Sequence, residues 1–295
     1  MDRNAQRAPH RGALLWLRAE TSIHVGQGQQ SGLIDQPFAR EGGTGYPYIP
    51  GSGMKGALRD ALRLTFAPSN SGESQTDMFF GTQEQAGPVL VSDARLAFLP
   101  VRSLSAPYRY LTCPHLLARL RRDLDFVMSP GGQASAAVTE GHYRGGPAAT
   151  EPLFLEEFPF QHAGDVDLSP VLQGLPQSVA DTVRSRVAVI CDDDFYYFAQ
   201  HSLHVRTRNA LDPISKTAAN TALWSEESLP PDTIMTAVLV PRLQSHAGIL
   251  HELLATYDKY LGGYFQVGAN ETVGEGWFGI VNLSEILTPA AGASA

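Results

Sequence analysis

The sequence predicts an α+β fold, and three observations support this prediction. Segments with the period of a strand and segments with the period of a helix alternate irregularly, unlike the regular alternation of a doubly wound sheet. Hydrophobic residues make up 43% of the 295 residues, which is enough for a sizeable core. No linker, fixed-period repeat or long low-complexity tract divides the chain, so we expect residues 1–295 to form one domain.

Strands and helices are placed by apolar periodicity and by the residues that start and stop each element. Strands are expected at residues 13–25, 89–99, 187–190, 203–208, 233–240 and 277–283. Helices are expected at residues 53–66, 114–125, 169–184, 192–200 and 246–260. Ser52 is the expected N-cap of the first helix, and the second has an apolar face formed by Leu116, Leu117, Leu120 and Leu124.

Glycine, proline and small polar residues mark the connections. Loops are expected at residues 26–50, 67–77 and 262–276. Residues 129–150 are rich in Gly, Ala and Ser and are predicted to be a mobile insertion. Residues from about 202 to 225 are expected to form a long β-hairpin.

Composition restricts the class of protein. The net charge of −8 argues weakly against a nucleic-acid partner, but residues 101–122 carry five arginines and no acid. Charged residues make up 18% of the chain, a low fraction that suggests surface covered by partners. Two cysteines form no disulfide framework, and the apolar run 13–17 is too short for a signal peptide or membrane span. We therefore expect a soluble cytoplasmic protein.

The glycine-rich stretch from Thr21 to Arg59 predicts a site where another molecule approaches the main chain. Lys55, Arg59 and Arg63 lie at a spacing of four and share one helix face. A glycine-rich entry, free N–H groups and a basic ridge together favour an anion site, and the alternative is a solvated basic face. Gly56 follows Lys55, so this is not a nucleotide P-loop, and a polyanionic backbone fits better than a bound nucleotide.

Asp35 is the candidate for chemistry, because a carboxylate between apolar residues is desolvated at a cost unless something uses it. It is a candidate general base or metal ligand, and the alternative is a carboxylate that bonds its own turn. His24 is nearby in sequence and belongs to the commonest proton-transfer residue type. A histidine on a strand can equally be structural.

The hairpin combines basic and aromatic residues. His204, Arg206 and Arg208 share one side of its first strand, and Trp224 lies on the return strand. This combination suits single-stranded nucleic acid, and the alternative is an ordinary exposed hairpin. The acid run 192–194 is expected to offset a helix macrodipole rather than to bind a metal.

Several runs together resemble a known family. HVGQGQQSGLIDQPFARE (24–41), TGYPYIPGSGMKGALR (44–59) and YFQVGANETVGEGW (264–277) are similar to the glycine-rich motifs of the RAMP superfamily of CRISPR proteins. The middle of the chain resembles the repeated backbone subunit of the Cmr (type III-B) effector, at FLPVRS (98–103), LTCPHLLARLRRD (111–123), LFLEEF (153–158) and LWSEESLPPDT (223–233). The type III-A equivalent matches the middle less well.

This resemblance implies a modified ferredoxin-like (RRM-like) palm, a fingers insertion and a thumb hairpin. It also implies partners for antiviral defence: a guide CRISPR RNA, a complementary single-stranded target RNA, other effector subunits, and copies of the chain stacked head-to-tail in a helical filament, with no membrane. The implied activity is cleavage of target RNA at regular intervals, one site per subunit.

The resemblance also assigns residues. Asp35 occupies the position of the family's cleaving acid, which acts with a divalent ion, Mg²⁺ or Mn²⁺, and no organic cofactor is expected. His24 and Glu227 are weaker candidates for supporting roles. The expected RNA-binding residues are Ser52, Gly53, Met54, Lys55, Gly56, Arg59, Arg63, Arg206, Arg208 and Gly268. The rival interpretation is a purely structural guide-binding subunit, with cleavage done elsewhere in the complex.

Overall fold

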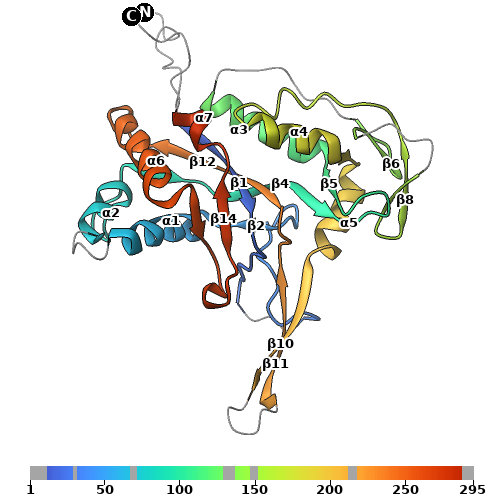
Figure 1. Cartoon of the computed structure of the whole chain (residues 1–295), viewed down its shortest axis with the longest axis horizontal. Coiled ribbons are helices and arrows are strands. Elements are labelled where there is room, and N and C mark those ends of the chain that lie inside the picture. Colours follow the sequence, from blue (N-terminus) through green and yellow to red (C-terminus); the bar gives the residue numbers. More distant parts are fainter. Residues whose placement is uncertain are drawn as a thin grey trace, which may run out of the picture.

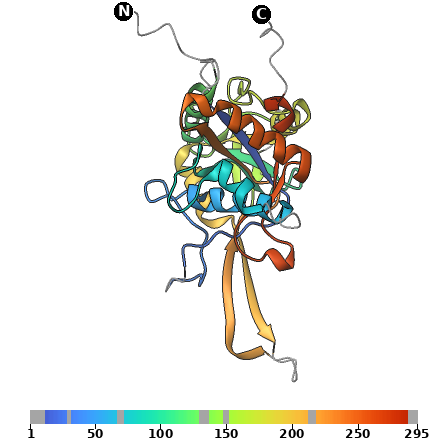
Figure 2. The ribbon, with the colours of Figure 1, turned by 90° about the vertical axis from the view of Figure 1, so that its left-hand side faces the viewer.

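A computed structural model of the chain describes residues 12–28, 32–66, 72–128, 137–146, 152–211 and 218–287. The fold is mixed α/β: one large sheet lies between two sets of helices, and a long hairpin extends away from it (Figures 1 and 2). Within the described residues, no helix has the length and apolar character needed to cross a membrane.

The large sheet has nine strands. Seven follow the order β13-β14-β1-β12-β4-β5-β9, while β2 pairs with β4 and β3 with β12. Their bounds are β1 Ala13–Ala19, β2 Tyr48–Ile49, β3 Val89–Val91, β4 Ala94–Val101, β5 Arg109–Thr112, β9 Val187–Val189, β12 Ile234–Pro241, β13 Tyr264–Gln266 and β14 Trp277–Ile280. The β5–β9 pair is parallel, and the other pairs are antiparallel.

The helices cover both faces of this sheet. Their bounds are α1 Gly51–Phe66, α2 Gly72–Phe80, α3 Pro114–Val127, α4 Gln177–Arg186, α5 Asp192–His201, α6 Ala247–Leu261 and α7 Leu283–Leu287, with short 3₁₀ turns at Gln244–His246 and Glu271–Val273. All four leucines expected on the inner face of α3 are buried, which confirms that prediction.

The alternating side chains of β1 show how the two layers form. Leu15 and Leu17 belong to the core cluster that includes residues of α1 and α6, whereas Leu14 and Trp16 belong to the cluster with residues of α3 and α4. Successive residues of a strand point to opposite faces. A strand covered on both faces reads as a continuous apolar run, which is why Ala13–Leu17 is apolar throughout.

Four central strands follow a simple connectivity. β1 leads through α1 to β4, and β12 leads through α6 to β14. In the sheet these strands lie in the order β14-β1-β12-β4, and all neighbours are antiparallel. Each helix-linked pair therefore has a strand of the other pair between its members.

The hairpin consists of β10 (His204–Leu211) and β11 (Ala218–Ser228) and leads into β12. It extends from the end of the sheet opposite α7 (Figure 1). A separate three-stranded sheet has the order β6-β8-β7, with β6 at His142–Tyr143, β7 at Leu153–Leu155 and β8 at Phe158–His162. The hairpin prediction is thus confirmed, with a longer return strand than expected.

Some predicted boundaries were wrong. The first strand ends at Ala19 rather than at residue 25, and α2 occupies part of the loop expected at 67–77. α4 begins at Gln177 rather than at residue 169, and α7 follows β14 where the last strand was expected to continue. Of the insertion predicted at 129–150, residues 129–136 and 147–150 lie outside the described residues, and the part between them contains β6.

The start of α1 also differs from the prediction. The helix begins at Gly51, so Ser52 lies in its first turn and is not the N-cap. The Gly51 N–H donates to Asp93 Oδ1 at 2.7 Å. A side chain distant in sequence therefore satisfies one of the free N–H groups of the helix start, a role that only the tertiary structure provides.

Candidate functional site

Asp35, the strongest candidate for a catalytic residue, lies beside the root of the hairpin. Its Oδ2 accepts a hydrogen bond from the Ser225 main-chain N–H at 2.7 Å and from Ser225 Oγ at 2.8 Å. The Asp35 N–H donates in return to Ser225 Oγ at 2.9 Å. Because Ser225 belongs to β11, these three hydrogen bonds attach Asp35 to the hairpin.

The Asp35 side chain is exposed to solvent, which corrects the expectation of a carboxylate desolvated by apolar neighbours. The nearby Leu33 is fully exposed as well. Hydrogen bonds from the main chain and then the hydroxyl of Ser225 lower the pKa of Asp35 below its ordinary value. The group is therefore an ionised carboxylate throughout the neutral pH range.

The loop that carries Asp35 lies along β11 like a short additional strand. The Gln36 N–H donates to the Ser225 carbonyl at 3.0 Å, and the Glu227 N–H donates to the Gln36 carbonyl at 3.0 Å. Gln36 and Glu226 form a parallel bridge. The position of Asp35 is therefore fixed by pairing with the hairpin.

Glu227 holds the same loop through its side chain. Its side chain is buried; Oε2 accepts the Phe38 N–H at 2.8 Å, and Oε1 accepts from Arg40 at 2.6 Å. Both carboxylate oxygens are thus occupied within the chain. The structure places Glu227 as a support of the Asp35 loop rather than in contact with solvent.

His24 is buried, with 4% of its surface exposed. Its Nδ1 lies 2.5 Å from the Glu227 carbonyl oxygen, and because a carbonyl only accepts, Nδ1 carries the hydrogen. The His24 carbonyl accepts the Ala269 N–H at 3.0 Å. His24 therefore joins β11 to the second glycine-rich loop (residues 267–276, between β13 and β14), and its side chain is buried.

The hairpin arginines pair with acids. Arg206 donates to Glu275 Oε1 at 2.6 Å, and Arg208 donates to Glu275 Oε2 at 2.7 Å and forms an ion pair with Glu226. The Asn270 side chain donates to both Glu226 and Glu275. The structure therefore uses Arg206 and Arg208 to clamp the second glycine-rich loop, and their charges are largely compensated within the chain.

The register of the hairpin separates these groups. Thr207 lies opposite Ser225, and Arg206 lies opposite Glu226. Opposite residues share a face of the hairpin, and successive residues alternate between faces. The Ser225 side chain, which binds Asp35, is therefore on one face, and the arginine clamp is on the other.

Gly268 has a structural reason to be glycine. Its φ is +86°, and a Cβ built there would lie 2.1 Å from the His24 carbonyl oxygen. That distance is far below any normal contact, so the second glycine-rich loop can approach His24 only because the side chain is absent. The sequence predicted RNA contact at this position, and the geometry explains the glycine through packing.

The basic face of α1 is partly neutralised. Arg59 forms an ion pair with Asp77 and donates to the Gly81 carbonyl at 3.0 Å. Arg63 forms an ion pair with Asp60 at 2.6 Å. In the described part of the chain, Lys55 is the member of this stripe with no ion pair.

At the start of α1, the predicted contact residues divide into two kinds. Ser52, Gly53 and Gly56 are exposed, but Met54 is completely buried. The Met54 side chain packs in the core, and its N–H donates to the Pro50 carbonyl at 2.9 Å, so neither group is free to contact an anion. This corrects the grouping of Met54 with the exposed residues.

Sequence reasoning missed Ser225, Glu226, Glu275 and Asn270. The signal was present, because SEE at 225–227 and NETVGEG at 270–276 contain the acids that form ion pairs with the arginines of β10. Charge alternation in one strand does not identify a partner strand, however. Only the tertiary structure shows which acid meets which arginine: Glu226 lies opposite Arg206 in the register but forms its ion pair with Arg208.

The described residues around Asp35 supply only part of the ligands that a divalent ion needs. Among the described residues, no group of three or more His, Cys, Asp or Glu side chains is arranged to hold a metal ion. Asp35 nevertheless has one carboxylate oxygen, Oδ1, that accepts no hydrogen bond from another residue in the described chain. Mg²⁺ is commonly held by one or two carboxylates together with substrate phosphates, so Asp35 fits such an ion only when RNA supplies further oxygens.

The acid run at the start of α5 has the expected helix role. Asp192 Oδ1 accepts the His115 N–H at 3.0 Å, and Asp194 Oδ2 accepts the Gly141 N–H at 2.9 Å. These acids lie in the first turn of α5, where negative charge offsets the macrodipole.

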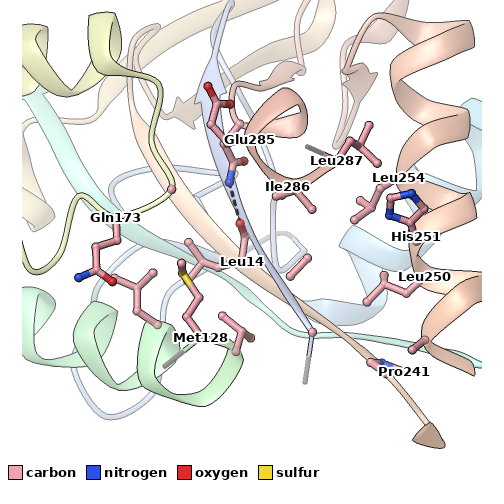
Figure 3. Close-up of a pocket in the computed structure, with 17 residues that line it drawn as sticks. Leu14, Met128, Gln173, Pro241, Leu250, His251, Leu254, Glu285, Ile286 and Leu287 are labelled. Carbon is pink, nitrogen blue, oxygen red and sulfur yellow. Dashed lines mark hydrogen bonds between the residues drawn. The ribbon is translucent and has the colours of Figure 1, made fainter. Parts of the chain in front are cut away.

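An apolar pocket of about 500 Å³ lies at the opposite end of the sheet from the hairpin, between α3, α6 and α7 (Figure 3). Leu14, Met128, Leu250 and Leu254 line it, and Asn282 donates to the Leu14 carbonyl at its wall. None of the residues predicted to bind or cleave lines this pocket. The candidate residues for chemistry lie at the hairpin root instead.

Comparisons with known proteins agree with the sequence motifs. The model of the RAMP superfamily matches residues 16–279. The CRISPR system Cmr endoribonuclease Cmr4 of Pyrococcus furiosus is 32% identical over 289 residues, which cover 92% of this chain and 96% of that protein.

Solved structures share the fold. The crystal structure of oligomeric Cmr4 from Pyrococcus furiosus matches with a TM-score of 0.71 at 29% identity, over 90% of this chain and 95% of that one. A chain in a cryo-EM structure of the type III-B Cmr-beta complex bound to cognate target RNA matches with a TM-score of 0.72, over 94% of this chain and 99% of that one. That chain is 22% identical, so it supports the fold alone. On the family model and the Cmr4 relative, this chain belongs to the RAMP superfamily and, within it, to the Cmr4 family.

Proposed function

We propose that this chain is a backbone subunit of a Cmr effector, which binds a guide RNA and cleaves complementary target RNA at Asp35. The Pyrococcus relative is named an endoribonuclease, and its Cmr4 has been solved as an oligomer. The alternative is a guide-binding subunit of the same filament without cleavage.

The observation that carries the proposal is the state of the Asp35 carboxylate. It is exposed, ionised at neutral pH and held at the base of a protruding hairpin. Ser225 occupies Oδ2 and leaves Oδ1 for a substrate. An exposed carboxylate tied down on one oxygen is suited to contact a ribose hydroxyl or a phosphate-bound cation.

The proposed reaction uses the RNA's own hydroxyl. The 2′-oxygen of an unstacked target nucleotide attacks the adjacent phosphorus, and the bond from phosphorus to the 5′-oxygen of the next nucleotide breaks. Asp35 either accepts the 2′-OH proton at Oδ1, or would hold a divalent cation there while solvent water accepts that proton. The leaving 5′-oxygen takes up a proton from water, so the products carry a 2′,3′-cyclic phosphate and a 5′-OH.

A Mg²⁺ or Mn²⁺ ion at Asp35 would neutralise charge that develops on the phosphate. The lowered pKa of Asp35 is consistent with this use, because a carboxylate that stays ionised attracts a cation and is a weaker base than an ordinary Asp. End-group analysis tests the hydroxyl route, since a 5′-phosphate on the product would exclude it.

We assign guide binding to the start of α1 and to the palm. The order β14-β1-β12-β4 with α1 and α6 on one face supports a ferredoxin-like palm. Ser52 and Gly53 are exposed in the first turn of α1, where N–H groups have no partner within the helix, and Gly56 is exposed on the next turn. Lys55 adds a charge that has no ion pair among the described residues. The phosphates of the guide are the expected ligand, and the other copies and subunits of the effector are the expected protein partners.

Asp35→Asn in the assembled complex tests the proposal. This change keeps the size of the side chain and removes its charge, and target cleavage should fall by roughly 10²–10⁴-fold. Guide binding and assembly should be unchanged, because the side chain is exposed and not part of the core. Cleavage is measured under single-turnover conditions with guide and target present.

Asp167→Asn is the matched control. Asp167 is also exposed, and hydrogen bonds from Ser169 lower its pKa in the same way. It lies before α4, in the layer on the other face of the sheet. If Asp35→Asn cleaves like the Asp167→Asn control while assembly stays intact, the non-cleaving alternative is correct.

A further inference from the structure

The Asp35 carboxylate depends on a single partner residue. Ser225 supplies both of its hydrogen bonds, from N–H and Oγ, and Ser225 Oγ also accepts the Asp35 N–H. Among the described residues, no other side chain is hydrogen-bonded to this carboxylate. An exposed Asp without such a partner samples several rotamers, so Ser225 determines where Oδ1 points.

Ser225 is itself held on both sides. It pairs with Thr207 of β10 across the hairpin, and its carbonyl accepts the Gln36 N–H from the Asp35 loop at 3.0 Å. Its hydroxyl therefore projects from a strand that is paired with β10 on one side and with the Asp35 loop on the other. A hydroxyl on a fixed strand can orient a carboxylate better than one on a free loop.

From this geometry we propose that Ser225 is a positioning residue for RNA cleavage: its hydroxyl and N–H hold Oδ2 of Asp35 so that Oδ1 faces the scissile phosphate. This inference rests on the proposed cleavage at Asp35. Because Ser225 belongs to β11, it also makes the position of the cleaving carboxylate follow the position of the hairpin. A hairpin seated on target RNA then carries Asp35 into place.

The competing explanation is that the Ser225 hydroxyl merely fastens the loop. Two features indicate that the hydroxyl positions the Asp35 carboxylate. The loop is already fastened by main-chain bonds of Gln36 and by Glu227, which holds Phe38 and Arg40. The hydroxyl adds its bonds only at Asp35 itself.

Cleavage rates of three variants separate these explanations. Ser225→Ala removes the hydroxyl and keeps the main-chain N–H, and the single-turnover rate should fall about 10- to 100-fold, as expected for a misplaced reactive group. Ser225→Thr keeps a hydroxyl on a β-branched side chain suited to a strand, and it should restore the rate to within about threefold of the wild type. Target affinity should be unchanged in both.

Thr207→Ala is the matched control, since Thr207 is the exposed cross-strand neighbour of Ser225 and makes no hydrogen bond to Asp35. It removes a hydroxyl from the same face of the same hairpin and should cleave at the wild-type rate. A wild-type rate in Ser225→Ala, or an equal loss in Thr207→Ala, overturns the proposal. Failure of Ser225→Thr to exceed Ser225→Ala overturns it as well.

A titration without RNA tests the contact independently of cleavage. The Asp35 carboxyl carbon is followed by NMR in the full-length chain, and its pKa should rise toward the ordinary Asp value in Ser225→Ala but not in Thr207→Ala. An unchanged titration in Ser225→Ala overturns the inference. If Asp35→Asn cleaves normally while this titration shifts as expected, the proposed function fails and the Ser225 contact stands, so the two failures are distinguishable.

Discussion

Gly268→Ala should destabilise the chain more than Gly274→Ala, although both glycines lie in the second glycine-rich loop and both have a positive φ. Two costs add. A residue with a Cβ at φ +86° is strained by about 1–2 kcal/mol. The new Cβ would also lie 2.1 Å from the His24 carbonyl oxygen, so the main chain must move, and such overpacking costs about 1–3 kcal/mol.

The neighbouring contact makes this second cost hard to avoid. The His24 carbonyl accepts the Ala269 N–H at 3.0 Å, so moving the loop away from His24 weakens that bond. The total is about 2–5 kcal/mol in the free energy of unfolding, partly offset because alanine restricts the unfolded chain by about 0.4–1 kcal/mol.

Gly274→Ala isolates the first cost. Gly274 has a φ of +81° in the same loop, but a Cβ there would meet nothing within 4 Å. It should lose about 1 kcal/mol, and the difference between the two variants measures the clash with His24. Urea denaturation followed by circular dichroism gives both values.

Equal losses in the two variants would refute the reasoning, because the close approach to His24 would then carry no cost. The result also bears on function. If Gly268→Ala folds normally but binds guide RNA poorly, its glycine serves the RNA contact predicted from the sequence rather than the packing described above.

Two further predictions follow from the charges. Lys55→Gln should flatten the log–log salt dependence of guide binding by about 0.7, which is the value for one phosphate contact on a single strand. The same loss of charge in Arg184→Gln on α4 should leave the slope unchanged. Equal slopes in the wild type and both variants would contradict a phosphate contact at Lys55. The second prediction concerns Glu41. Burial of this side chain disfavours its ionised form, but hydrogen bonds from Arg119 and Thr44 favour that form more strongly, so the pKa of Glu41 is lowered. A lowered folded-state pKa stabilises the fold above the ordinary Glu pKa, and this contribution is lost as pH falls through the lowered value. Arg119→Gln should therefore cost about 1–2 kcal/mol at pH 7 and progressively less below about pH 4.5, measured by urea denaturation across pH; a loss independent of pH would contradict the pairing.

The elements that the sequence placed correctly share a local signal. The four inward leucines of α3 follow helical spacing, and the acids of α5 lie in its first turn, so both could be placed without knowing their neighbours. Errors occurred where a boundary depends on a distant group. α1 begins two residues before the predicted start because Asp93, from the β3–β4 connection, accepts the Gly51 N–H.

The candidate site divides in the same way. Asp35 was found from its motif, but the reason given for it, desolvation among apolar residues, was wrong because its side chain is exposed. Glu227 and His24 were expected to support chemistry, and the structure places both as buried braces. Arg206 and Arg208 were expected to face RNA, and both are paired with Glu275.

The sequence by itself determined the family, the alternation of strands and helices and the hairpin, and it singled out Asp35 as the candidate carboxylate, because these depend on residue types and on spacing along the chain. The tertiary structure decided which groups meet. Asp35 and Ser225 are 190 residues apart, and so close a contact arises only when the loop pairs with β11 in one register. Register also separates the Asp35 face of the hairpin from the arginine clamp, since a shift of one residue would exchange the two faces.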